Sequence, residues 1–131
     1  MSCSLDGHCQ PALVLGTGAR LAAGTDLAAL GPVTYFVAMV PEDPSLPRGE
    51  NFGYMGESFR QLGPVMEANN ARLVIEGWPG PGALCCTPEN FRAFFDAIPS
   101  KAMGVNYDPS HLLRMGIDPI RFLKEFVGRV Y

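Results

Sequence analysis

The amino-acid sequence predicts an α/β fold built on a parallel sheet, because three apolar strands recur along the chain with helical segments between them. The strands are expected at 33–40, 72–76 and 102–107. Each is nearly continuous in its apolar residues, which is typical of strands buried on both faces. The strands follow one another at intervals of about thirty residues, a spacing that favours right-handed βαβ units.

The first of these helical segments is expected over 54–70, after a polar, Pro-rich loop at 41–53. Its apolar residues fall on roughly one face of a helix, and they are Phe59, Leu62, Val65 and Met66. Gly63-Pro64 interrupts the pattern and predicts a kink or a restart. Asn69-Asn70 is expected to end the helix.

Two later helices carry clear start signals. Thr87-Pro88-Glu89 places a capping hydroxyl, a proline and an acid in the order that helix starts favour, and Asp118-Pro119 repeats this logic. The first of the two should bury Phe91, Phe94, Phe95 and Ile98. The second should run to about Val127, and Arg129–Tyr131 then begins a further strand.

The N-terminal part is less regular, with a strand expected at 2–5 and a small-residue helix at 19–30. Together the elements amount to about half of an eight-stranded (β/α)8 barrel. We therefore expect residues 1–131 to form a single partial barrel domain and the chain to be a fragment of a longer protein.

Composition narrows the class of protein. A chain of 131 residues with 47% hydrophobic and 18% charged residues is globular. Its net charge of −3 does not favour binding to nucleic acid or to an anionic membrane. There is no apolar run of the roughly 20 residues that would span a bilayer. The first residues lack a basic region followed by an apolar stretch, so we do not expect secretion. The four cysteines, Cys3, Cys9, Cys85 and Cys86, are expected to be reduced, which favours a cytoplasmic protein.

The chemistry is expected where two strands end on carboxylates, Glu76 and Asp108. The carboxyl ends of parallel strands share one face, so these side chains should lie close together and repel. A divalent cation that bridges the two carboxylates would relieve this repulsion, and so would a raised pKa that keeps one of them protonated. His111 would lie in the same loop, able to bind a second metal or to hydrogen-bond a substrate hydroxyl, and Trp78 follows Glu76 by two residues.

Each of these residues also has a purely structural interpretation. Asp108 before Pro109 can cap a turn, and Glu76 can be a solvated loop charge. His111 and Trp78 can simply pack against their surroundings. The coincidence of two carboxylates on consecutive strand ends is what favours a site.

Two sequence strings resemble the sugar phosphate isomerase/epimerase family, whose members are xylose isomerase-like TIM barrels and include the endonuclease IV type of DNA-repair enzyme. The strings are 73–80, LVIEGWPG, and 104–112, GVNYDPSHL. Segments 115–119 and 126–131 continue the resemblance, which is clear over 33–131 and weak over 1–32. It implies a partial TIM (β/α)8 barrel.

The resemblance also implies roles for individual residues. Glu76 would be a metal ligand and a catalytic acid/base group, and Asp108 a second metal ligand. His111 would be a substrate-binding residue or, in the nuclease branch, a ligand of a second metal. For a sugar substrate, Trp78 could bind by stacking on a sugar face. The cation would be Mn²⁺ or Mg²⁺, with Zn²⁺ an alternative. Gly77 departs from the asparagine common after that glutamate. The implied activity is isomerisation or epimerisation of a sugar or sugar phosphate by proton transfer through an enediolate.

Two alternatives stay open. An endonuclease IV-like metallo-hydrolase needs several histidines, and this chain has only His8 and His111. A non-catalytic truncated fragment is the other, because the family's remaining ligands would come from later strands. The expected partner is a small sugar, with no nucleic acid and no membrane. The unpaired edges of a half-barrel leave a homo-oligomer open as well.

Overall fold

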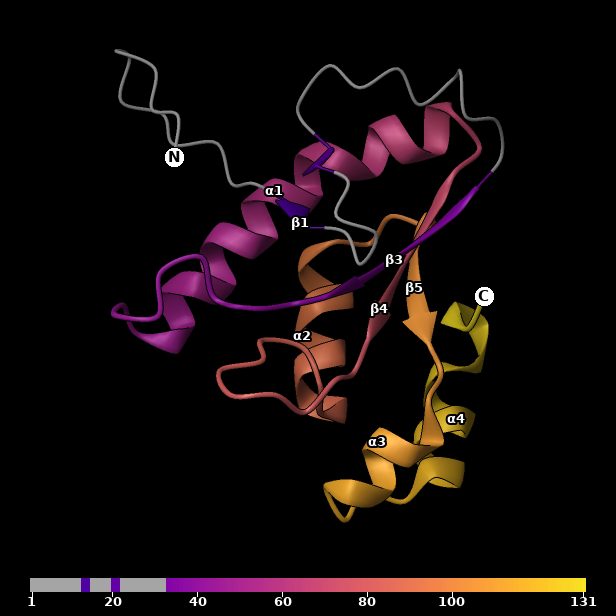
Figure 1. Cartoon of the computed structure of the whole chain (residues 1–131). Helices are drawn as coiled ribbons and strands as arrows, with labels where there is room; N and C mark the ends of the chain where they lie inside the picture. Colours follow the sequence, from indigo (N-terminus) through magenta and orange to yellow (C-terminus); the bar gives the residue numbers. More distant parts are fainter. Residues whose placement is uncertain (1–12, 15–19, 22–32) are drawn as a thin grey trace.

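The computed structural model describes residues 13–14, 20–21 and 33–131, and a parallel sheet lies at its centre (Figure 1). The sheet has the strand order β3-β4-β5. Its strands are β3 (Thr34–Ala38), β4 (Arg72–Glu76) and β5 (Met103–Asn106). Both pairings are parallel, so the predicted α/β class is confirmed.

The register brings the carboxyl ends of the three strands level with one another. Ala38 pairs with Glu76, and Glu76 pairs with Asn106. Beyond β5, Val130 forms a parallel bridge with Val105, where a fourth strand would lie. The strand predicted at Arg129–Tyr131 is thus represented by this one bridge, which follows the short 3-10 helix η2 (Val127–Arg129).

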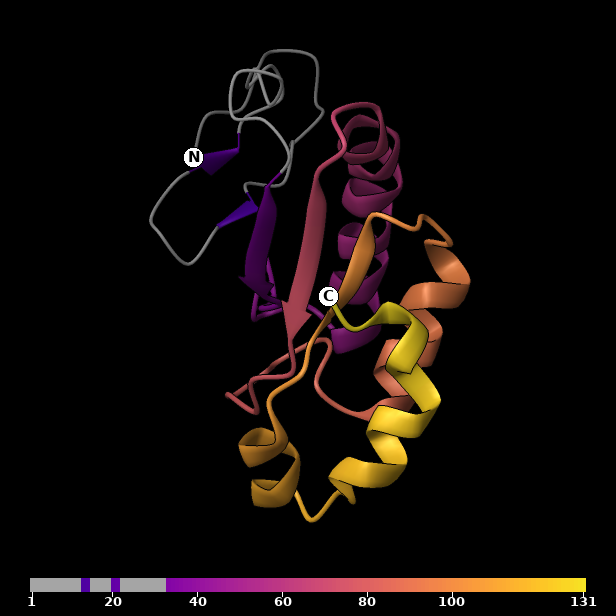
Figure 2. The same cartoon turned by 90° about the vertical axis from the view of Figure 1, so that its right-hand side faces the viewer.

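Three helices cover one side of the sheet, as Figures 1 and 2 show together: α1 (Arg48–Ala68), α2 (Pro88–Ala97) and α4 (Pro119–Phe126). Alternate strand residues point towards them and form the core with helix residues. The core contains Val37, Leu73, Ile75, Met103 and Val105 from the strands, with Phe59, Met66, Phe91, Phe94, Phe122 and Phe126 from the helices. The opposite side of the sheet contributes little to this core.

Helix α1 begins earlier than the sequence predicts and runs without interruption through Pro64. Pro64 lies on the exposed side, where water can hydrate the carbonyl that loses its partner. Gly63 is buried, and a Cβ there would lie 3.0 Å from Cβ of Ser100. Val65, predicted to be on the buried face, is 44% exposed instead.

Hydrogen bonds from two side chains, Arg48 and Asn51, explain the early start of α1. The buried side chain of Asn51 donates to the backbone carbonyls of Asp43 and Leu46, and its Oδ1 accepts from the backbone N–H of Asp43. The guanidinium of Arg48 donates to the carbonyls of Ala83 and Leu84, each at 2.9 Å. These bonds fix the first turn of the helix although the sequence there has no capping signal.

Helices α2 and α4 begin as predicted. Thr87 caps α2 by accepting from the backbone N–H of Asn90, and Asp118 caps α4 by accepting from Ile120 and Arg121. The face predicted for α2 is confirmed, because Phe91, Phe94 and Ile98 are buried and Phe95 is partly buried.

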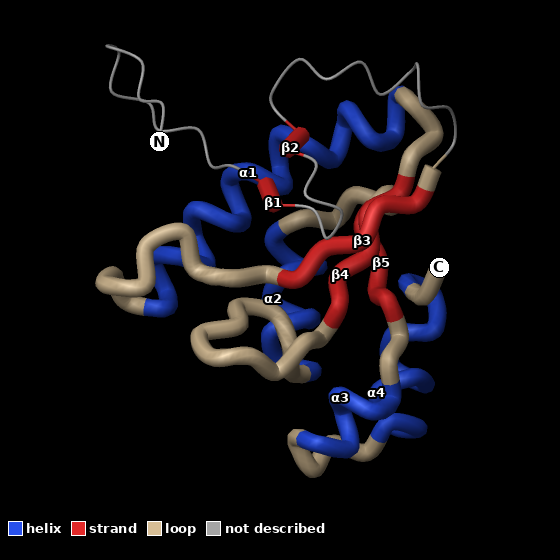
Figure 3. The backbone as a smooth tube through the Cα atoms, viewed as in Figure 1, coloured by secondary structure: helices blue, strands red, loops and turns tan. Residues whose placement is uncertain are grey.

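The N-terminal segment departs from prediction where the structure describes it. Arg20–Leu21 (β2) pairs antiparallel with Leu13–Val14 (β1), so the helix predicted at 19–30 is wrong at those two residues (Figure 3). Strand pairing here takes precedence over helix propensity. The strand predicted at 2–5 lies outside the described residues, as do Cys3, Cys9 and His8.

Within the described part of the chain, no helix is both long and apolar enough to cross a membrane. Cys85 is buried and Cys86 partly buried, and both are free thiols as predicted. Burial raises the pKa of both thiols. They are therefore thiols, not thiolates, at neutral pH.

Candidate metal-binding site

Glu76 is the last residue of β4, and its side chain is 20% exposed. It follows Ile75, whose side chain is fully buried in the core. Because successive strand residues point to opposite faces, Glu76 points away from the helices. The carboxylate therefore stands at the carboxyl end of the sheet, as predicted.

Asp108 serves as the N-cap of the short helix α3 (Pro109–Arg114). Its Oδ1 accepts a hydrogen bond from the backbone N–H of Ser110 at 2.8 Å. Asp108 therefore does cap the segment that follows the strand, as its structural interpretation predicts. The capping bond uses only Oδ1, and Oδ2 faces His111. Hydrogen bonding from the Ser110 side chain, then from its backbone, lowers the pKa of Asp108, and the carboxylate is ionised at neutral pH.

His111 joins the two carboxylates. Its Nε2 lies 3.2 Å from Oε1 of Glu76 and 3.6 Å from Oδ2 of Asp108. Asp108 and His111 are three residues apart at the start of α3, and this helical spacing brings their side chains together. The other ring nitrogen of His111, Nδ1, is buried without a hydrogen-bond partner in the described structure.

The three side chains offer a donor set that fits a divalent cation. One ligand atom from each lies within 4.8 Å of the others. Ligands around an ion at about 2.0–2.2 Å are separated by at most about 4.4 Å, so small side-chain rotations bring all three into contact with one ion. Two carboxylates and an imidazole suit Mn²⁺ and Zn²⁺, while Mg²⁺ prefers oxygen.

The sequence model of the xylose isomerase-like TIM barrel family matches residues 23–129. The chain belongs to this family. A comparison with curated protein sequences found no match. The family includes sugar isomerases and epimerases as well as the endonuclease IV type of enzyme, and the described sheet and helices are a part of its barrel.

In this xylose isomerase-like chain, Trp78 lies on the loop between β4 and α2, two residues after Glu76. Its indole ring lies over Gly80: a Cβ added there would come within 1.9 Å of Cζ3 and 2.0 Å of Cη2. The side chain is 39% exposed. Among the described residues, the side-chain hydrogen bond of Glu76 is to His111 and not to Trp78, and the predicted role of Trp78 in substrate binding stays a prediction.

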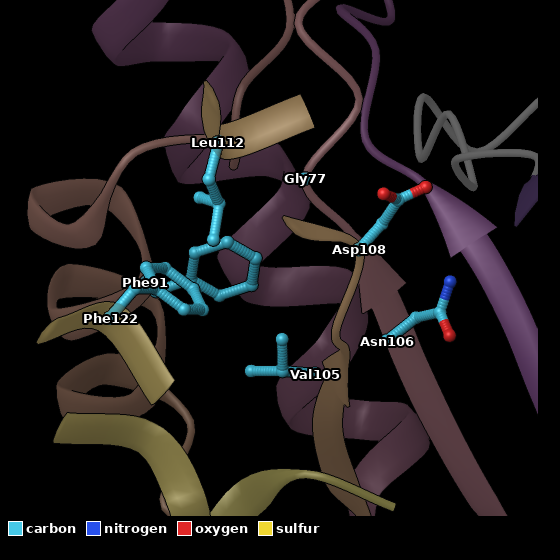
Figure 4. Close-up of a pocket in the computed structure, with 7 residues that line it drawn as sticks. All are labelled: Gly77, Phe91, Val105, Asn106, Asp108, Leu112 and Phe122. Atoms are coloured by element: carbon cyan, nitrogen blue, oxygen red, sulfur yellow. The ribbon is translucent and has the colours of Figure 1, made fainter. Parts of the chain in front are cut away.

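A small pocket lies beside the cluster, between the ends of β4 and β5 and the helices. It is lined by Gly77, Phe91, Val105, Asn106, Asp108, Leu112 and Phe122. Figure 4 shows that Asn106 and Asp108 project from the opposite side of the backbone to Phe91, Leu112 and Phe122. The pocket is therefore an apolar gap in the helix-sheet packing, and the polar chemistry lies on the other face.

Asn106 is the polar residue that the sequence reasoning missed. It is partly buried, and it pairs in register with Glu76 on the neighbouring strand. Alternation along the predicted strand places Asn106 on the face opposite Val105, but only the register of the folded sheet places it beside Glu76. A lone asparagine near a strand end carries no signature of its own.

Proposed function

We propose that this protein is a metal-dependent isomerase or epimerase of a sugar or sugar phosphate. The observation that supports it best is the convergence of Glu76, Asp108 and His111 within 4.8 Å at the ends of adjacent parallel strands. In parallel α/β barrels this is the face where active sites are built. Family membership supports this reaction class, because the family includes sugar isomerases and epimerases.

Glu76 and Asp108 would hold the cation, and His111 lies close enough to be a third ligand or to bind a substrate hydroxyl. The bound ion would supply Lewis acidity towards the oxygens of an α-hydroxycarbonyl compound. Mn²⁺ and Mg²⁺ are the expected ions, and the imidazole makes Zn²⁺ an alternative.

The protein side chains would perform the proton transfer. The Glu76 carboxylate would take the proton from the carbon beside the carbonyl, giving an enediolate, and a proton would then return to a substrate carbon. His111, 3.2 Å from Oε1, would hold this carboxylate in one orientation. Asp108 is held in turn by the hydrogen bond that its Oδ1 accepts from the backbone N–H of Ser110.

Proton abstraction can be measured before the natural substrate is known. Aldoses, ketoses and their phosphates would be incubated in D2O with Mn²⁺ or Mg²⁺, and NMR would detect deuterium at the carbon beside the carbonyl. Glu76→Gln should reduce this exchange by about 10²- to 10⁴-fold, the usual contribution of a general base. Its circular dichroism should be unchanged.

Glu50→Gln is the matched control, because Glu50 is an exposed acid in the first turn of α1. This variant should exchange at the wild-type rate. Exchange at the wild-type rate in Glu76→Gln would contradict the proposal. Cleavage of an abasic DNA duplex without any sugar exchange would instead assign the protein to the hydrolase branch of the family.

A further inference from the structure

Asn106 lies next to Glu76 on the face of the sheet that carries the candidate site. The two residues are register partners on β5 and β4. Neighbouring strands are about 4.8 Å apart, so their side chains are direct neighbours. Figure 4 shows the Asn106 amide and the Asp108 carboxylate on the same side of the backbone.

The amide adds a chemistry that the neighbouring carboxylates lack. A carboxylate only accepts hydrogen bonds, whereas an asparagine amide donates two and also accepts. Nε2 of His111 is already within hydrogen-bond distance of Glu76. Asn106 is partly buried, and the side-chain hydrogen bonds described around the site, Ser110 to Asp108 and His111 to Glu76, do not involve its amide. A neutral donor is thus available beside the carboxylate.

We propose that Asn106 is a substrate-binding residue whose Nδ2–H donates to the carbonyl oxygen of an open-chain α-hydroxycarbonyl sugar. This inference rests on the proposed function. When Glu76 takes the proton, the C–H electron pair forms the new carbon-carbon double bond and the carbonyl π pair moves onto oxygen. A donor aimed at that oxygen stabilises the charge as it develops.

A kinetic comparison tests this role. Asn106→Ala should slow deuterium exchange into the sugar by about 10- to 100-fold, as expected for loss of a hydrogen bond to a charged group. Asn106→Asp keeps the shape but replaces the donor with a third acceptor, so exchange should be at least as slow. Thr34→Ala is the control, because Thr34 lies on the same face at the other end of β3. It should exchange at the wild-type rate.

Metal binding separates this inference from the proposed function. Asn106→Ala should bind Mn²⁺ with wild-type affinity in a calorimetric titration, since the amide is not among the ligand atoms. If Asn106→Ala exchanges at the wild-type rate while Glu76→Gln does not, the role of Asn106 is overturned and the proposed function stands. If both variants retain exchange, both ideas fail.

A direct contact can be seen by NMR without turnover. The sequence contains five asparagines, so ¹⁵N-asparagine labelling gives five side-chain amide pairs. The pair missing in Asn106→Ala identifies Asn106. Titration of the Mg²⁺-loaded protein with the same aldoses and ketoses should shift this pair more than those of Asn69 and Asn70, at the far end of α1. No shift with any of these sugars would overturn the proposal.

Discussion

Nε2 of His111 lies 3.2 Å from Oε1 of Glu76, and this contact joins the first turn of α3 to the end of β4. The two residues are 35 positions apart in the chain. Their approach depends on Asp108, which starts α3 and also faces His111. The helix cap and the candidate site are therefore one structure, and substitutions can separate the two roles.

The two Asp-Pro caps provide a matched pair of substitutions. Asp108→Asn and Asp118→Asn both retain a capping side chain, so each should change the free energy of unfolding by less than about 1 kcal/mol. Only Asp108 belongs to the ligand cluster. We expect Asp108→Asn to weaken Mn²⁺ binding by at least about tenfold, and Asp118→Asn to leave it unchanged. Equal affinities in calorimetry would contradict the metal site.

The role of His111 can be decided by metal titration of His111→Gln. If the imidazole is a ligand, its loss should weaken Zn²⁺ binding more than Mg²⁺ binding, because zinc favours nitrogen and magnesium oxygen. If it binds the substrate, both affinities should remain and sugar binding should weaken. Unchanged metal binding and unchanged sugar binding together would show that His111 only orients Glu76.

Asp108 also predicts a specific dependence of stability on pH. Hydrogen bonds from Ser110 lower the pKa of this carboxyl below its ordinary value of 3.8, so the ionised form stabilises the folded state. That stabilisation is present above about pH 3.8 and is lost as the pH falls through the lower folded-state pKa. The difference in unfolding free energy between the wild type and Asp108→Asn should therefore be constant near neutrality and shrink in acid. A difference that grew in acid would contradict the shift.

Gly80 should control the position of Trp78. Any side chain at Gly80 would collide with the indole ring, so Gly80→Ala should displace it. Trp78 is the one tryptophan in the sequence, and intrinsic fluorescence reports on it alone. We expect a shift in the emission maximum for Gly80→Ala and none for Gly49→Ala, because Gly49 has open space around it. If sugar binding also weakens, Trp78 takes part in it.

Local signals in the sequence predicted much of this fold. The strands and the helix caps at Thr87 and Asp118 were predictable because short-range chemistry sets them. Asp108 was expected to cap only a turn, whereas it begins helix α3, so His111 lies in that helix and not in a loop. The start of α1 was not, since Arg48 and Asn51 fix it through contacts that the linear sequence does not reveal. The carboxylates of the site were found through strand ends, whereas Asn106 required the register of the folded sheet.

The bonds from Arg48 also bear on how the loop between β4 and α2 can move. Its guanidinium holds Ala83 and Leu84, and the backbone N–H of Leu84 donates to Met39 after β3. The later half of this loop is therefore held by the body of the domain. The stretch 77–82, which carries Trp78, lies between this held half and the end of β4, so the hydrogen bonds of Arg48 set the position of the backbone on which Trp78 is mounted.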